Sequence, residues 1–208
     1  MSIHRETIEW LDLWVQRADV IASGKPRVLC IGDSVTRGWY MGGGESLLLP
    51  WCDPARVCSS RSVCDPHLRR EIDLVLGSYR FDVIHFNNGL HGWDHSEDDY
   101  RAGLQQTITA IIVQAPDAQI ILASTTPTRQ AGNTQVAADM DTRVRQRNTI
   151  ASELCAEMRL EWNDLYTLAD DHTAWFADDG VHYHAEGSHG LAAACAARIR
   201  QAWDSRSR

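Results

Sequence analysis

Two short segments of the chain carry residue types that together could perform nucleophilic catalysis. An apolar run ends at Gly32-Asp33-Ser34, and Asp179-Gly-Val-His182 stands near the other end of the chain. A serine hydroxyl becomes a good nucleophile when a base removes its proton. Histidine suits this task near neutral pH, and a carboxylate can orient the histidine. The two segments therefore predict a serine hydrolase in which Ser34 attacks, His182 is the base and Asp179 orients it.

Each segment has a simpler interpretation when it is taken alone. Ser34 could cap a helix or lie in a loop, and Asp179-Gly180 is a common turn dipeptide. Asp178, directly before Asp179, is a rival carboxylate. The joint occurrence of both segments, in this order on a chain of alternating strands and helices, is a much stronger signal than either segment alone.

Apolar runs typical of buried strands alternate along the chain with segments of helical spacing. The predicted strands are residues 27–32, 55–59, 81–86, 119–124 and 160–165. The predicted helices are residues 5–22, 66–77, 98–114, 137–158 and 185–204. This alternation predicts a single α/β domain over residues 1–208, with a parallel sheet and helices on both of its faces.

Polar residues directly follow several of the predicted strands. Ser34 follows the first strand, residues 87–91 follow the third, and residues 125–126 follow the fourth. Since ligands of open parallel sheets bind at the carboxyl ends of the strands, we expect these residues to meet at one edge. Asp82 and His85, in the third predicted strand, are interpreted as polar groups at the edge of the sheet.

Residues 38–54 are predicted to form a long loop, because they are rich in glycine and proline. The segment also contains the aromatic residues Trp39, Tyr40 and Trp51, which are expected to be exposed. Two interpretations carry equal weight: the rings form a wall of a substrate site, or they pin the loop in place. The glycines at 42–44 are no phosphate-binding loop, since the Lys-Ser/Thr pair that should follow them is absent.

The charge balance argues against polyanionic partners. The chain has 208 residues, with 28 acidic and 20 basic side chains and a formal net charge of −8. Phosphate binding requires a basic surface, so neither nucleic acid nor an anionic membrane is expected as a partner. The N-terminus lacks the apolar region of a signal peptide, and no apolar run is long enough for a membrane span. A cytoplasmic location and a small-molecule ester substrate are expected, with no prediction of oligomeric state.

No metal ion or organic cofactor is predicted. Cys52, Cys58 and Cys64 stand six residues apart in one irregular region, whereas paired zinc ligands usually stand two to four apart. We therefore expect free thiols there. The residues near the end of the chain that could suggest a metal also lack the spacing of a helix-borne ligand pair. They are Asp178, His182, His184 and His189.

These motifs resemble those of the SGNH hydrolases, also called the GDSL esterase/lipase family. Ile31-Gly-Asp-Ser-Val-Thr-Arg-Gly38 is similar to the family's nucleophile block, and Asp179-Gly-Val-His182 is similar to its Asp-x-x-His block. The resemblance implies Ser34 as nucleophile, His182 as general base and Asp179 as its orienter, with no cofactor. It also implies a flavodoxin-like three-layer sandwich of about five parallel strands, and it covers nearly the whole chain.

The chain departs from the family pattern at two places that concern the oxyanion. The family usually has Gly-x-Asn-Asp after the third strand, where this chain reads Gly89-Leu-His91-Gly92. His91 therefore stands where an oxyanion-binding Asn is expected; a neutral imidazole can donate one N–H, and Asn88 is the second candidate. The glycine that usually follows the second strand is also missing, and a backbone N–H of Ser59, Ser60 or Ser62 could replace it.

The expected function is hydrolysis of a small acyl ester, of acetyl type and on a carbohydrate, through an acyl-serine intermediate. The backbone N–H of Ser34 and the side chain of His91 are the expected oxyanion donors. The alternatives are an acyltransferase, a lysophospholipase or a thioesterase of the same fold. A further alternative from another class is a non-catalytic binding protein with an altered oxyanion hole.

Overall fold

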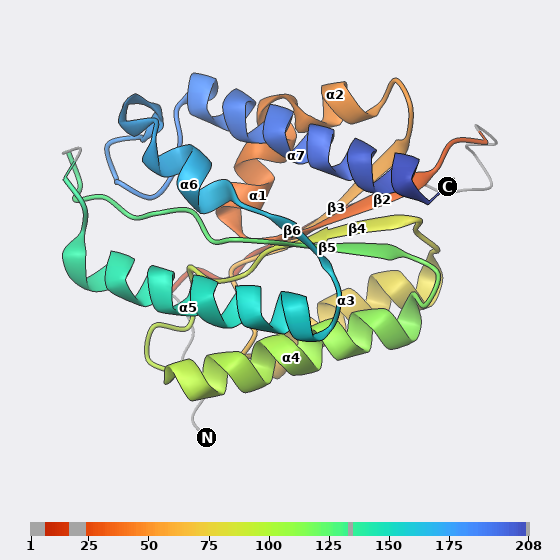
Figure 1. The fold of residues 1–208 in the computed structure, drawn as a ribbon, viewed down its shortest axis with the longest axis horizontal. Helices are drawn as coiled ribbons and strands as arrows, with labels where there is room; N and C mark the ends of the chain where they lie inside the picture. The colour runs from red at the N-terminus through yellow and green to blue at the C-terminus, as the bar shows by residue number, and fades with distance from the viewer. Residues whose placement is uncertain (1–6, 17–23, 133–134, 207–208) are drawn as a thin grey trace.

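The computed structural model describes residues 7–16, 24–132 and 135–206, which form one six-stranded sheet covered by helices (Figure 1). The strand order is β1-β3-β2-β4-β5-β6; β1 runs antiparallel to β3, and all other neighbouring strands are parallel. The strands are β1 Leu11–Trp14, β2 Arg27–Gly32, β3 Asp53–Ser59, β4 Val83–Phe86, β5 Gln119–Ala123 and β6 Glu161–Asn163.

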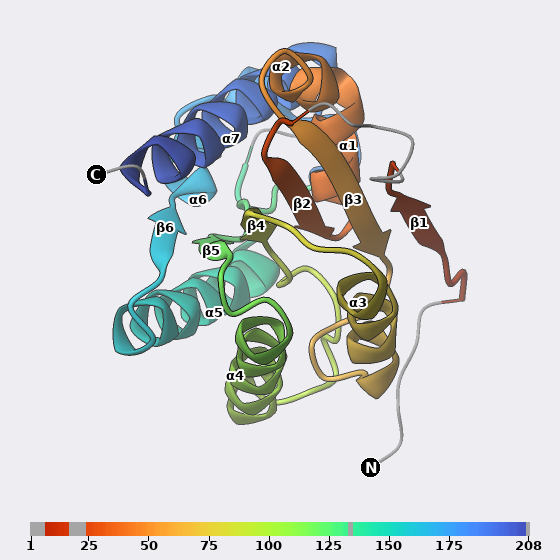
Figure 2. The same cartoon turned by 90° about the vertical axis from the view of Figure 1, so that its right-hand side faces the viewer.

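Helices cover both faces of this sheet. Figures 1 and 2 show α1, α2, α6 and α7 on one face and α3, α4 and α5 on the other. The long helices are α3 Pro66–Ser78, α4 Glu97–Gln114, α5 Ala138–Glu157 and α7 Ala185–Ser205. The short ones are α1 Ser34–Trp39, η1 Tyr40–Gly44, α2 Glu45–Leu48, α6 Leu165–Asp170 and η2 Thr173–Trp175. The predicted α/β sandwich with helices on both faces is therefore confirmed.

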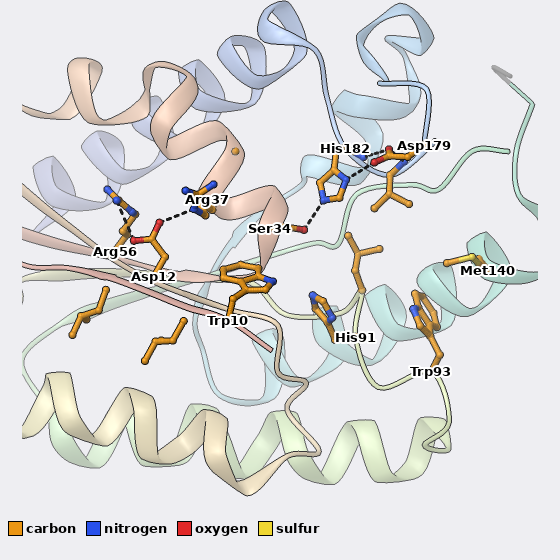
Figure 3. A pocket seen from close by; sticks show the side chains of 15 residues that line it. Trp10, Asp12, Ser34, Arg37, Arg56, His91, Trp93, Met140, Asp179 and His182 are labelled. Carbon is orange, nitrogen blue, oxygen red and sulfur yellow. Dashed lines mark hydrogen bonds and ion pairs between the residues drawn. The ribbon is translucent and has the colours of Figure 1, made fainter. Parts of the chain in front are cut away.

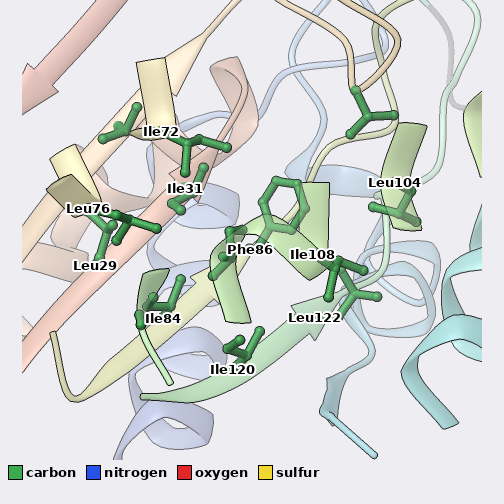
Figure 4. Close-up of a cluster of buried hydrophobic side chains, with 14 of the residues drawn as sticks. Leu29, Ile31, Ile72, Leu76, Ile84, Phe86, Leu104, Ile108, Ile120 and Leu122 are labelled. Atoms are coloured by element: carbon green, nitrogen blue, oxygen red, sulfur yellow. The ribbon is translucent and has the colours of Figure 1, made fainter. Parts of the chain in front are cut away.

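The strands alternate their side chains between two hydrophobic cores, because successive residues of a strand point to opposite faces. Leu29 and Ile31 of β2 face α3 and α4, whereas Val28 and Cys30 face α7. Figure 4 shows the first core, in which Ile84 and Phe86 of β4 lie among the same side chains. Burial on both faces explains the unbroken apolar runs of the central strands.

The N-terminal segment differs from its prediction. A helix was expected over residues 5–22, but Leu11–Trp14 form the edge strand β1, paired in the register Leu11↔Ser59 to Trp14↔Arg56. Residues 5–6 and 17–22 of that prediction lie outside the described residues. Leu11 and Leu13 are two apart, a spacing that also fits a strand, and pairing with the free edge of β3 outweighs the helical pattern. The sheet thus has five parallel strands, as implied, plus one antiparallel edge strand.

The predicted long loop over residues 38–54 is also wrong, since most of it is helical. Trp39 and Tyr40 are buried rather than exposed, with 1% and 0% of their surface accessible. Their rings pack in the core under α7, so they pin this segment and form no substrate wall. The glycines serve close packing: Gly43 has a φ of 138°, and a Cβ on it would lie 2.7 Å from His189 Nδ1 of α7.

His85 lies in the core and not at the edge of the sheet, which corrects the prediction for this residue. It is completely buried in β4, and its Nε2 lies 3.0 Å from Asn163 Nδ2. The ring stands edge-on to Trp39, with a centroid distance of 5.5 Å. Because burial disfavours the charged imidazolium, the pKa of His85 falls from 6.5 to about 4. By contrast, Asp82 fits its prediction, because its carboxylate precedes β4 and accepts from Arg27 N at 2.8 Å.

The buried His85 should make the fold sensitive to acid. Below pH 6.5 the unfolded chain binds a proton at this histidine that the folded chain does not bind until about pH 4. Lowering the pH through this window should therefore reduce the free energy of unfolding, by about 3 kcal/mol at most. Denaturant unfolding between pH 7 and 4 measures this slope, and the His85→Gln variant should lose that part of it. Equal slopes for both proteins would contradict the assignment.

Candidate active site

Ser34 lies at the turn where β2 passes directly into α1. The Asp33 carboxylate caps the helix and accepts from Val35 N at 3.0 Å, so Ser34 is the first helical residue. Gly32 permits the tight turn, because a Cβ there would lie 2.1 Å from Thr36 Oγ1. The N–H groups of a first helical turn have no intrahelical acceptor, so the Ser34 N–H can serve an anion at this position.

Asp179 and His182 lie in a tight turn before α7. Asp179 Oδ1 accepts two backbone N–H groups, from Val181 and from His182, each at 2.9 Å. Gly180 has a φ of 73°, and a Cβ on it would lie 2.2 Å from Arg129 O. These contacts fix the conformation of the turn, and with it the relative positions of Asp179 and His182, without any contribution from Ser34.

The structure brings Ser34, His182 and Asp179 together in a hydrogen-bonded chain (Figure 3). His182 Nε2 lies 2.7 Å from Ser34 Oγ, and His182 Nδ1 lies 2.6 Å from Asp179 Oδ2. An ionised carboxylate only accepts hydrogen bonds, so Nδ1 carries the proton and Nε2 is left to accept from the serine hydroxyl. This is the tautomer that a general base needs.

Asp179 remains ionised at neutral pH. Partial burial raises the pKa of its carboxyl, but the hydrogen bonds from the His182 ring and from the two backbone N–H groups outweigh burial. The net result is a pKa below the ordinary value. The charge next to Nδ1 would stabilise an imidazolium formed when His182 takes a proton from Ser34. Asp178, the rival carboxylate, makes no side-chain hydrogen bond or ion pair with His182 among the described residues.

His91 and Asn88, the two side chains expected near the oxyanion, lie in different surroundings. His91 lines the same pocket as Ser34, and Figure 3 shows its ring below the serine. Asn88 is buried: its Oδ1 accepts from Val63 N at 3.0 Å and its Nδ2 donates to Arg61 O at 2.8 Å. Asn88 therefore ties the loops after β3 and β4 together, which leaves His91 as the side-chain candidate.

The serines after β3 also separate into different roles. Ser60 N donates to Trp10 O at 3.2 Å, and Ser60 Oγ accepts from Trp10 N at 3.1 Å. The N–H of Ser60 therefore already has an acceptor in the segment before β1. Ser59 lies within β3 and pairs with Leu11. Ser62 packs against Gly92 of the loop that carries His91, since a Cβ on Gly92 would lie 2.6 Å from Ser62 Oγ. Ser62 is thus the remaining backbone candidate for a second donor.

The pocket around Ser34 has a volume of about 1100 Å³. On one side it is bounded by the segment Trp10–Leu13, and on another by Trp93 and Met140 (Figure 3). The charged side chains on its wall balance, because two carboxylates stand against two guanidinium groups. They are Asp12, Asp179, Arg37 and Arg56.

Three of these charged groups form one cluster. The Asp12 carboxylate forms ion pairs with both arginines: its Oδ2 lies 2.6 Å from Arg37 Nε, and its Oδ1 lies 3.1 Å from Arg56 Nη2. Partial burial raises the pKa of Asp12, but the hydrogen bonds from Arg56 and Arg37 hold it below its ordinary value. This side of the pocket was not predicted from the sequence. Arg37 stands three residues after Ser34 on a helix, a spacing that places both on one face, and that signal could have found it.

Within residues 7–16, 24–132 and 135–206, no three His, Cys, Asp or Glu side chains gather as metal ligands would. Cys52 and Cys58 are buried, and burial raises the pKa of the Cys52 thiol to about 12. In the same part of the chain, no helix has the length and apolar character needed to cross a bilayer.

Comparisons with solved structures identify the fold. A GDSL-like lipase from Bacteroides thetaiotaomicron VPI-5482 has a TM-score of 0.66 at 14% identity, over 85% of this chain and 89% of that chain. LAE5, an alpha/beta hydrolase enzyme from the metagenome of Lake Arreo, Spain, has 0.68 at 16% identity, over 86% and 96%. Axe2, an acetylxylan esterase from Geobacillus stearothermophilus, has 0.63 at 21% identity, over 84% and 94%.

The chain therefore has the fold of the SGNH, or GDSL-like, hydrolases, which confirms the fold implied by the resemblance. No protein-family model matches the sequence, and no curated protein matches it. Because a fold supports many reactions, the reaction has to be derived from the residues of the site.

Replacing Asp179 by Asn should abolish most ester hydrolysis. The amide removes the charge beside Nδ1 and favours the wrong tautomer of His182, so kcat should fall by about 10⁴. Asp178→Asn is the matched control, since it changes the neighbouring carboxylate in the same turn, and it should retain activity. Turnover of p-nitrophenyl acetate measures both. Equal losses in the two variants would contradict the assignment of Asp179.

Proposed function

We propose that this protein is a serine esterase that hydrolyses small acyl esters of neutral, polar alcohols. The observation that carries the proposal is the hydrogen-bonded chain from Ser34 through His182 to Asp179 at the edge of an open pocket. The three groups have the distances and the tautomer that nucleophilic acyl transfer requires.

The reaction divides into two steps. In the first, Ser34 Oγ attacks the ester carbonyl while His182 Nε2 takes its proton. The bond between the carbonyl carbon and the alcohol oxygen then breaks, and the proton passes from His182 to the leaving alcohol. In the second, His182 Nε2 takes a proton from water, whose oxygen attacks the carbonyl carbon of the acyl-serine. The bond between that carbon and Ser34 Oγ then breaks, and the proton passes from His182 to Ser34 Oγ, which releases the acid.

Two groups are suited to stabilise the negative oxygen of the tetrahedral intermediates. The N–H of Ser34 lies at the start of α1, where the helix favours negative charge. The His91 side chain lines the same pocket and can donate one N–H as a neutral imidazole. Asp179 stabilises the imidazolium of His182 in both steps.

The shape and charge of the pocket support a polar alcohol of appreciable size. About 1100 Å³ is far more than an acetyl group needs, so most of the pocket is available to the alcohol. Balanced charges on the wall favour a neutral substrate, and Trp10 offers a flat apolar surface to a sugar ring. Axe2, one of the similar structures, is itself an acetylxylan esterase. An acetylated carbohydrate is therefore the proposed substrate class.

Acyl-chain preference and the role of Ser34 can be measured together. On a series of p-nitrophenyl esters, kcat/KM should be highest for acetate or propionate and fall for longer chains. Ser34→Ala should lower kcat by about 10⁶, because it removes the nucleophile. Unchanged turnover in Ser34→Ala would exclude the covalent mechanism, and an optimum at long acyl chains would exclude the proposed substrate.

Trp10 should matter for the alcohol part of the substrate and not for the acyl part. Trp10→Ala should raise KM for an acetylated xylo-oligosaccharide about five- to tenfold, the magnitude expected for lost aromatic packing. KM for p-nitrophenyl acetate should change less than about twofold, because that alcohol is small. Trp14→Ala is the control, since Trp14, four residues after Trp10 at the end of β1, is half-exposed and does not line the pocket. Equal effects of Trp10→Ala on both substrates would contradict this role.

A further inference from the structure

Arg147 of α5 binds the loop that carries His91 through three backbone carbonyl groups. Its Nη1 donates to Gly89 O at 2.8 Å and to His91 O at 2.7 Å, and its Nη2 donates to Gly92 O at 2.9 Å. Gly89 and Gly92 stand on either side of Leu90 and His91, two of the loop residues that line the pocket. One planar side chain thus fixes the backbone on which His91 is mounted.

The surroundings of Arg147 allow it little freedom. It is completely buried, and its Nε donates to Glu97 Oε2 at 3.0 Å. Its guanidinium carbon lies 4.7 Å from the centre of the Trp93 ring and 4.8 Å from that of Tyr100. A buried charge is costly unless its donors are paired, so any loop conformation that withdraws the carbonyl groups would be strongly disfavoured.

Neighbouring contacts support the same loop from other sides. Tyr100 Oη donates to Asn88 O at 2.8 Å, and Arg143, one turn before Arg147, donates to the carbonyl groups of Trp93 and His95. On its far side Gly89 packs tightly, since a Cβ there would lie 2.0 Å from Thr125 Oγ1. Arg147 is the member of this group whose acceptors flank His91 itself.

We propose that Arg147 is a positioning residue, which holds His91 in place for the negative oxygen of the tetrahedral intermediate. The proposal rests on the proposed esterase function. Stabilisation of an oxyanion depends on donors that are fixed before charge develops, because a mobile donor must be reoriented during the reaction. Arg147 therefore contributes to the rate through His91 and not by touching the substrate.

Arg147→Lys tests this role, since lysine keeps the charge but lacks the planar fork that binds three carbonyl groups. With p-nitrophenyl acetate, kcat should fall about ten- to a hundredfold, part of the loss expected for a missing oxyanion donor, while KM changes little. Amide hydrogen exchange in residues 88–95 should become faster. Arg101→Lys is the matched control: Arg101 joins α4 to Glu153 and Glu157 of α5, away from the loop, and its variant should retain wild-type activity.

A double-mutant cycle separates positioning from general destabilisation. If Arg147 acts through His91, adding Arg147→Lys to His91→Ala should cost no further activity, because the donor is already gone. If the two losses multiply, Arg147 does not act through His91 and the proposal is wrong. Wild-type kcat and unchanged exchange in Arg147→Lys would also overturn it, while leaving the esterase proposal intact. A folded wild-type protein that hydrolyses no ester would overturn both proposals.

A milder variant keeps the test decisive if Arg147→Lys does not fold. Glu97→Gln leaves the guanidinium in place and weakens the acceptor of its Nε. In this variant kcat should fall about threefold or more with KM unchanged, and the loss should vanish in the His91→Ala background. A folded Glu97→Gln protein with wild-type kcat and wild-type loop exchange would contradict the proposal.

Discussion

The hydrogen bond between His182 Nε2 and Ser34 Oγ joins two turns that stand 148 residues apart in the sequence, and the candidate site depends on it. Each turn is built locally, one around the Asp33 cap and the other around the two N–H groups that Asp179 accepts. The two turns meet because the parallel sheet gathers the ends of its strands at one edge, where α7 also begins.

The side of the site that carries the candidate oxyanion donors is held by different contacts. Asn88, three residues before the position of the missing Asn, ties the loop after β4 to the segment after β3. His91 lines the pocket instead, and Arg147 donates a hydrogen bond to its backbone carbonyl. The segment before β1 forms hydrogen bonds with Ser60, so the N–H of Ser60 is not available as an oxyanion donor. The two places where the motifs depart from the family pattern are therefore held by contacts between the segments after β3 and β4 and by Arg147.

Much of this arrangement could be predicted from the sequence, because it rests on local signals. The apolar run before Gly32-Asp33-Ser34 predicted β2 with its bounds, and the helix predicted from residue 66 begins at Pro66 in the structure. The Asp179–His182 pair was predicted from spacing within one turn, and the structure places it against Ser34.

The features that could not be predicted depend on contacts between distant segments. Leu11–Trp14 form a strand only because the edge of β3 is free to pair with them. Trp39 and Tyr40 are buried only because glycines allow α7 to approach. Arg147 has no sequence signal of its role, since its acceptors are backbone carbonyl groups more than fifty residues away. The ion pair between Arg56 and Asp12 likewise has no sequence signal, because it depends on the pairing of β1 with β3.

The most direct test of the central claim is covalent labelling of the folded protein with a fluorophosphonate, followed by mass spectrometry of the labelled peptide. Activation of Ser34 by His182 predicts a single adduct on Ser34, no adduct in Ser34→Ala, and much slower labelling in His182→Ala. Ser34 that stays unlabelled in the folded wild-type protein, or labels as fast without His182, would contradict the account.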